Sequence, residues 1–200
     1  MNMRIFLFLI VFVGATSILP AVACDAIGQP SEDLLEKLGD IEATVTNPGA
    51  VEGLLTTASN CADSHAINAS LAFSHSIVGD FGAAAAYMEA AFETGWGTEL
   101  QRAEMLRKTA DYHLNSDNLE RASQLYEQAL EHSVELKLKI IPSLVRTHIG
   151  LVSYDKAAYW ADQFNEMGGI ISTPYTHRLF AIAYAQTCLL YTSPSPRDRG

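Results

Sequence analysis

Three histidines mark an internal repeat, which constrains the fold of this 200-residue chain more than any other sequence feature. His75, His113 and His148 are separated by 38 and 35 residues. A small or β-branched residue stands three positions before each histidine, and an alanine stands nine positions after it. The preceding residues are Ala72, Ala110 and Val145, and the alanines are Ala84, Ala122 and Ala157. Several positions that keep register in three copies predict one repeated structural unit, packed against its neighbours.

Each unit has the pattern of two helices joined by a short turn. Apolar residues recur at steps of three and four, as on the buried face of a helix. In the second copy this face consists of Leu119, Ala122, Leu125, Tyr126, Ala129 and Leu130. The expected turns are Gly79-Asp80, Asn115-Ser116-Asp117 and Val152-Ser153, and the expected capping boxes are Thr98 with Gln101 and Asp117 with Glu120. No strand-like alternation of any length occurs, so the chain is predicted to be all-α.

This unit resembles the tetratricopeptide repeat (TPR), a helix–turn–helix motif of about 34 residues. The second copy carries the resemblance as Leu106-x2-Thr109-Ala110-x2-His113, then Ala122-x3-Tyr126 and Ala129-Leu130. It departs from the family pattern at the first tryptophan, the tyrosine and the closing proline. The resemblance covers about residues 65–187, as units at 65–98, 103–136 and 138–171 and a partial unit at 174–187. It implies a right-handed α–α superhelix, a TPR-like solenoid of antiparallel helical hairpins truncated at the C-terminus, whose concave face binds a protein or peptide.

Residues 31–64 have the pattern of one more, degenerate hairpin that lacks the repeat register. Ser31 is expected to cap a helix that carries Leu34, Leu35, Leu38 and Ile41. Asn47-Pro48-Gly49 would end that helix, and a second would run from about Ala50 to Cys61. Terminal units of a solenoid often depart from the repeat in this way.

The N-terminus has the order of a secretory signal peptide. Arg4 precedes an apolar run from Ile5 to Leu19, and Ala21-Val22-Ala23 follows as a cleavage region. Residues 1–23 would be removed on export and 24–30 would be a linker. The alternative is an uncleaved anchor helix, for which the apolar run is short.

The C-terminus is interpreted as a non-native tail. Residues 188–198 resemble a translated sequencing adaptor, so 188–200 would not belong to the fold and the natural protein would continue past Thr187. The helix of 175–187 would then lack its partner and expose Phe180 and Tyr184.

Two cysteines, Cys24 and Cys61, remain between these ends. Export permits a disulfide, which would tie the start of the mature chain to residue 61. The alternative is lipidation of Cys24, which falls at the expected cleavage point. The two exclude each other, because lipidation uses the Cys24 sulfur.

The distribution of charge suggests a basic groove in an acidic protein. Without both ends, ten basic and 22 acidic residues remain, which disfavours nucleic acid as a partner. Seven of the ten basic residues fall within 102–146. By the family alignment, the inward positions are Ala69, Phe73 and Ser76 in the first copy, Arg107, Asp111 and Asn115 in the second, and Lys139, Ser143 and Arg146 in the third. Such a groove would hold an acidic peptide or a free carboxylate. The alternative is that these bases neutralise Glu104, Asp111 and Glu135.

No pattern for catalysis, a metal or a cofactor is found. The three histidines would lie about 10 Å apart in stacked hairpins, whereas zinc needs ligand nitrogens within about 2.1 Å, so they are interpreted as packed replacements for the family's tyrosine. Trp96, between two glycines, is either a recognition aromatic or a residue that closes over a neighbouring hairpin.

The sequence therefore predicts a non-enzymatic, periplasmic or secreted scaffold that binds a protein or peptide without a cofactor. One alternative is the binding module of a longer enzyme whose catalytic domain lies beyond residue 187. Another is a lipid-anchored subunit of an envelope assembly complex.

Overall fold

The computed structural model describes residues 28–42, 48–132 and 136–192, and within these ranges the chain is all-α, as predicted. No strand occurs in this described part. None of its helices is both long and apolar enough to cross a membrane. The expected signal peptide and Cys24 lie outside the described residues.

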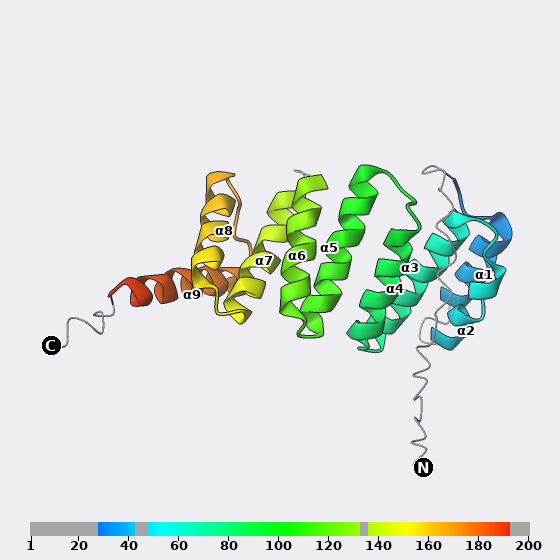
Figure 1. Ribbon diagram of the computed structural model, residues 1–200, viewed down its shortest axis with the longest axis horizontal. Helices are drawn as coiled ribbons and strands as arrows, with labels where there is room; N and C mark the ends of the chain where they lie inside the picture. Colours follow the sequence, from blue (N-terminus) through cyan, green and yellow to red (C-terminus); the bar gives the residue numbers. More distant parts are fainter. Residues whose placement is uncertain (1–27, 43–47, 133–135, 193–200) are drawn as a thin grey trace, which may run out of the picture.

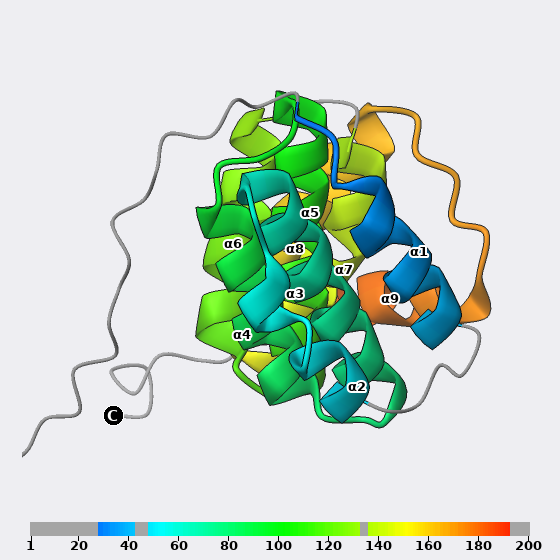
Figure 2. The same ribbon diagram turned by 90° about the vertical axis from the view of Figure 1, so that its right-hand side faces the viewer.

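Three helical hairpins follow one another in the middle of the chain. They are α3 (Cys61–Ile77) with α4 (Phe81–Glu93), α5 (Glu99–Asn115) with α6 (Leu119–His132), and α7 (Lys137–Gly150) with α8 (Tyr154–Glu166). Figure 1 shows these helices side by side in chain order, each packed against the next. At one end lie α1 (Glu32–Glu42) and α2 (Pro48–Glu52), and α9 (Pro174–Thr192) lies across the other end. Figure 2 views this row from its α1 end. The hairpins coincide with the three expected copies, although each first helix begins up to four residues early.

The same turn closes the first helix of every hairpin. The backbone N–H groups of Asp80, Asn118 and Ser153 donate to the carbonyls of His75, His113 and His148 at 2.9, 2.9 and 2.8 Å. The residue before each donor has a positive φ, which is 83° at Gly79, 59° at Asp117 and 58° at Val152. This is the Schellman arrangement, in which a left-handed residue lets an N–H reach back over the helix end. The expected turn positions are confirmed, and the repeat seen in the sequence is also a repeat in backbone geometry.

The two expected capping boxes have different outcomes. The side chains of Thr98 and Gln101 each bond the other residue's backbone N–H and begin α5, as predicted. The pairing of Asp117 with Glu120 is wrong. Asp117 takes the left-handed conformation that closes α5, and α6 begins only at Leu119, so Asp117 cannot also cap α6.

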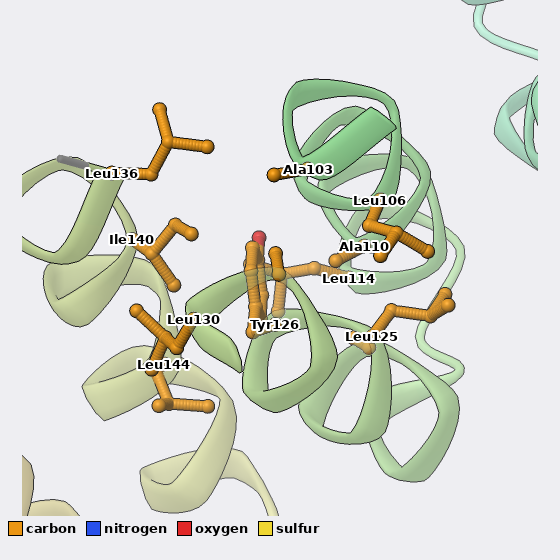
Figure 3. Close-up of a cluster of buried hydrophobic side chains, with 12 residues drawn as sticks. Ala103, Leu106, Ala110, Leu114, Leu125, Tyr126, Leu130, Leu136, Ile140 and Leu144 are labelled. Atoms are coloured by element: carbon orange, nitrogen blue, oxygen red, sulfur yellow. The ribbon is translucent and has the colours of Figure 1, made fainter. Parts of the chain in front are cut away.

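The core runs through each hairpin and on into the first helix of the next unit. Tyr126 of α6 is fully buried, and Figure 3 shows its ring between Ala110 of α5 and Ile140 of α7. All six small or β-branched positions that define the repeat have no exposed surface: Ala72, Ala84, Ala110, Ala122, Val145 and Ala157. Small side chains let the helix backbones approach closely, and the larger side chains fill the space between neighbouring hairpins. The positions that mark the repeat are therefore positions where helices pack closely, within hairpins and between them.

An acidic side chain of the preceding unit lies beside each repeat histidine. The nitrogen-to-oxygen distances are 3.9 Å for His75 and Glu52, 3.4 Å for His113 and Glu89, and 3.8 Å for His148 and Glu127. At the next junction Tyr184 stands in the position of the histidine and donates a 2.8 Å hydrogen bond to Asp162. The acids come from α2, α4, α6 and α8 in turn. A polar contact thus repeats at each junction between consecutive units.

The N-terminal unit differs from the expected hairpin. Leu34 and Leu38 of α1 are buried, in the predicted position. The predicted second helix, from about Ala50 to Cys61, is wrong: α2 starts at Pro48, a short 3₁₀ turn follows at Leu55–Thr57, and Cys61 begins α3. Proline was expected to break a helix here, but at a first helical position its missing N–H and fixed φ favour a start.

A buried carboxylate attaches this unit to α3. Asp63 is 1% exposed and accepts hydrogen bonds from the backbone N–H of Ser31 at 2.7 Å and from the hydroxyl of Ser59 at 2.5 Å. Burial alone would raise the pKa of Asp63, but these hydrogen bonds to the charged form lower it overall. The segment before α1 is therefore fixed to the first complete hairpin.

The expected exposure of the last helix is wrong for Phe180. Phe180 is 3% exposed and its ring packs edge-on against Phe164, with centroids 5.4 Å apart. Because α9 lies across α7 and α8, the preceding hairpin alone covers its apolar face. The helix also continues to Thr192, through the first five residues of the segment that resembles an adaptor.

We expect Val152→Gly to stabilise the chain by about 1 kcal/mol. Val152 is β-branched, has a φ of 58° and is 68% exposed, so the change relieves strain and removes little buried surface. Urea unfolding measures the gain. Val78 is the matched control, because it is 53% exposed near the equivalent turn but has a φ of −82°. Val78→Gly should lower stability, and a loss at both positions would contradict the strain at Val152.

His148 should make the fold less stable in acid. It is 1% exposed, neither ring nitrogen has a hydrogen-bond partner, and the Glu127 carboxylate is 3.8 Å away. Burial, assisted by the charge of Lys156, lowers the pKa of His148 to about 4. The pKa of a histidine in an unfolded chain is about 6.5. Because the pKa of His148 is lower in the folded state, the neutral ring contributes its full stabilisation above about pH 6.5. The free energy of unfolding then decreases by roughly 3 kcal/mol as the pH falls to 4.

Urea unfolding between pH 7 and 4 tests this. His148→Leu should weaken the pH dependence of the free energy of unfolding across that window. His132→Leu on α6 is the control, because the His132 side chain is 42% exposed. An unchanged pH dependence in His148→Leu would show that His148 does not titrate in this way.

Candidate functional site

Two of the expected groove residues, Arg107 and Asp111, pair with each other. Arg107 Nη1 lies 2.6 Å from Asp111 Oδ2, and Arg107 Nε lies 2.5 Å from Glu104 Oε2. Asp111 also accepts a 2.5 Å hydrogen bond from the hydroxyl of Tyr126. The charge of Arg107 is therefore balanced within α5, which agrees with the alternative that the bases neutralise nearby acids.

The surroundings of this cluster favour a structural contribution. Burial raises the pKa of Asp111, although the Tyr126 hydroxyl and Arg107 oppose the change. Burial also raises the pKa of Tyr126 far above its ordinary value, and the neighbouring Asp111 adds to the effect. Arg107 holds its proton more strongly because Glu104 and Asp111 outweigh its burial, so its pKa is raised. Groups satisfied in this way are poor partners for a ligand.

The remaining expected groove residues stay available. Asn115 at the end of α5 and Lys139 and Arg146 on α7 are exposed. Neither Lys139 nor Arg146 forms an ion pair with another described residue. No described contact joins them to Arg107, so their part in a groove stays a prediction.

Trp96 joins three segments of the chain. It lies between α4 and α5, flanked by Gly95 and Gly97, whose φ values of 77° and 101° need glycine. The indole stacks on the ring of His65 in α3, with centroids 4.2 Å apart, and its Nε1 donates to the carbonyl of Gly28 at 2.5 Å. Trp96 therefore folds back over the hairpin that precedes it.

Two hollows adjoin the stacked rings of Trp96 and His65, and both rings and Ala69 line each of them. The Trp96 hollow, about 360 Å³, lies between α3 and α5, and its other walls include Met88, Leu100, Glu104, Met105 and Lys108. The α1 hollow, about 450 Å³, lies between α1 and α3, and its other walls include Pro30, Leu35, Leu38 and Ala66. Such volumes fall in the range of small-molecule and side-chain binding sites.

Sequence reasoning found part of this site. Ala69 was an expected inward position, and Trp96 was identified as a residue of interest. His65 and Lys108 were missed because they lie outside the repeat markers, and Met88 was identified only as the repeat position that Tyr126 holds in the second copy. Lys108 directly follows Arg107 in the expected basic region. Because consecutive residues of a helix point in different directions, the Lys108 side chain lines the Trp96 hollow, whereas the Arg107 side chain pairs with acidic residues.

No group of three or more His, Cys, Asp and Glu residues in the described part could hold a metal ion. Cys61 is half-buried at the start of α3. Its expected partner, Cys24, lies outside the described residues, so the disulfide and its lipid alternative stay predictions.

We expect Tyr126→Phe to lower the free energy of unfolding by about 2 kcal/mol, because it removes a buried hydrogen bond to the Asp111 carboxylate and preserves the ring. Tyr87→Phe is the control, since the Tyr87 hydroxyl donates at 3.2 Å to the more exposed Glu52. That change should cost about 0.5 kcal/mol. If both variants lose the same free energy of unfolding in urea, the hydrogen bond to Asp111 stabilises the fold no more than the one to Glu52 does.

Comparison with known proteins identified no matching family model, no matching curated protein and no matching solved structure. What the chain does must therefore be inferred from its own helices and side chains.

Proposed function

We propose that the chain is a non-enzymatic scaffold that binds a protein or peptide partner on the face formed by α1, α3 and α5. In this proposal the chain is exported to the cell envelope and its hairpins form a TPR-like solenoid with the first helices on the inner face. The repeated hairpins, their shared turn and the TPR-like register support the solenoid. The signal-peptide pattern of residues 1–23 supports export.

The observation that carries the proposal is a strip of exposed apolar side chains beside the two hollows. Leu35 is 49% exposed and lines the α1 hollow, and Leu100 is 47% exposed and lines the Trp96 hollow. Phe73 is 51% exposed and lies one turn along α3 from Ala69, which lines both. Large apolar side chains gathered on a hollowed face are typical of surfaces that bind other proteins.

An extended peptide is the form of partner that suits this face. The two hollows lie on either side of the Trp96–His65 wall, and each could take one apolar side chain. Side chains on one side of an extended chain are about 7 Å apart, so neighbouring anchors could enter neighbouring hollows. Trp96 is fixed by its stack and by Gly28, and a fixed aromatic wall costs little ordering on binding.

A displayed peptide library selected on the purified chain tests the proposal. We expect the selected peptides to carry apolar residues at alternate positions. Phe73→Ser and Leu100→Ser should each weaken their binding about tenfold, as the loss of an interface anchor does, and leave the helical circular dichroism unchanged. Tyr159→Ser is the matched control, because Tyr159 is 55% exposed but lies on the second helix α8.

Two results would count against this site. Peptides that bind the Phe73 and Leu100 variants as well as the parent chain would place the binding surface elsewhere. Equal weakening by Tyr159→Ser would show that the peptides bind exposed apolar side chains without selecting a face.

A further inference from the structure

The size of the Trp96 hollow limits what it can hold. Its volume is about 360 Å³. At roughly 30 Å³ for each water-sized group, this is room for about twelve non-hydrogen atoms. One apolar side chain of a peptide would occupy part of this space, whereas a linear ten-carbon amphiphile would fill it.

The walls of the hollow are mainly apolar. Ala69, Leu100 and Trp96 provide fixed surfaces, and Met88 and Met105 extend into it from α4 and α5. Methionine side chains are unbranched and adapt to the shape of an alkyl chain. Trp96 cannot swing away easily, because its ring stacks on His65 and its Nε1 bonds to Gly28.

Three ionisable side chains face the hollow, and one of them, Lys108, has no ion-pair partner among the described residues. Glu104 is paired with Arg107 at 2.5 Å. Burial, with the nearby charge of Lys108, lowers the pKa of His65, so the ring is neutral at pH 7. Lys108 is exposed and forms no ion pair with another described residue. The hollow is therefore mainly apolar, with one lysine at its wall that pairs with no carboxylate of the described residues.

We propose that the Trp96 hollow binds a free monocarboxylic acid with an apolar chain of about ten carbons, and that Lys108 pairs with its carboxylate. The apolar chain would displace water from the methionine, leucine and tryptophan walls, which supplies most of the affinity. The ammonium group would select an anion over an alcohol or an amine of the same length. This site shares the Trp96 hollow with the peptide-binding proposal, but it needs neither Phe73 nor the α1 hollow.

Calorimetric titration of the full chain with decanoate, decanol and decylammonium, each below its micelle-forming concentration, tests the proposal. Decanoate should bind at one site and more tightly than the other two. Lys108→Gln should weaken decanoate about fivefold, the effect of losing one ion pair near the surface, and leave decanol unchanged. Lys139→Gln is the matched control, because Lys139 is also exposed and unpaired but lies on α7 outside the hollow.

A second variant tests the location of the site. Ala69→Phe should fill the hollow and remove the binding of both decanoate and decanol, whereas Phe73→Ser should affect neither. The proposal is overturned if decanol binds as tightly as decanoate, if Lys108→Gln changes nothing, or if many weak sites are seen. It is also overturned if a short peptide with a C-terminal leucine and a free carboxylate binds with Lys108 dependence and decanoate does not.

Discussion

The whole molecule depends on apolar packing that joins the two helices of each unit and continues into the first helix of the next. Tyr126 shows this dependence most clearly, because its ring belongs to α6 but is enclosed by α5 and α7. A single hairpin would leave part of this surface in water, so neighbouring units stabilise one another. The alanines at the contacts are as necessary as the large side chains, since they set how closely the helices approach.

Polar groups at the same junctions add direction to this packing. An acid of the preceding unit stands beside His75, His113 and His148, and Asp162 stands beside Tyr184. The backbone carbonyl of each of these three histidines accepts the hydrogen bond of the turn that ends the first helix. One residue position therefore closes a helix through its backbone and contacts the neighbouring unit through its side chain, which explains why this position stands out in the sequence.

The candidate site arises where the regular packing is interrupted. The longer connection between α4 and α5 carries Gly95, Trp96 and Gly97, and it places an indole over α3 between two hollows. Apolar side chains remain exposed beside those hollows, and Lys108 forms no ion pair with another described residue. A surface with hollows, exposed apolar side chains and a lysine that no described carboxylate pairs is the part of the molecule best suited to a partner or a ligand.

The sequence by itself determined the helical class, the three hairpins and the positions of their turns, because helix periodicity and left-handed turns are local properties. It also placed the repeat histidines and the alanines at contacts. Only the tertiary structure decided that Lys108 faces a hollow and that Phe180 is covered by the hairpin before it. Those outcomes depend on which side chains distant in the sequence meet, and no local pattern contains that information.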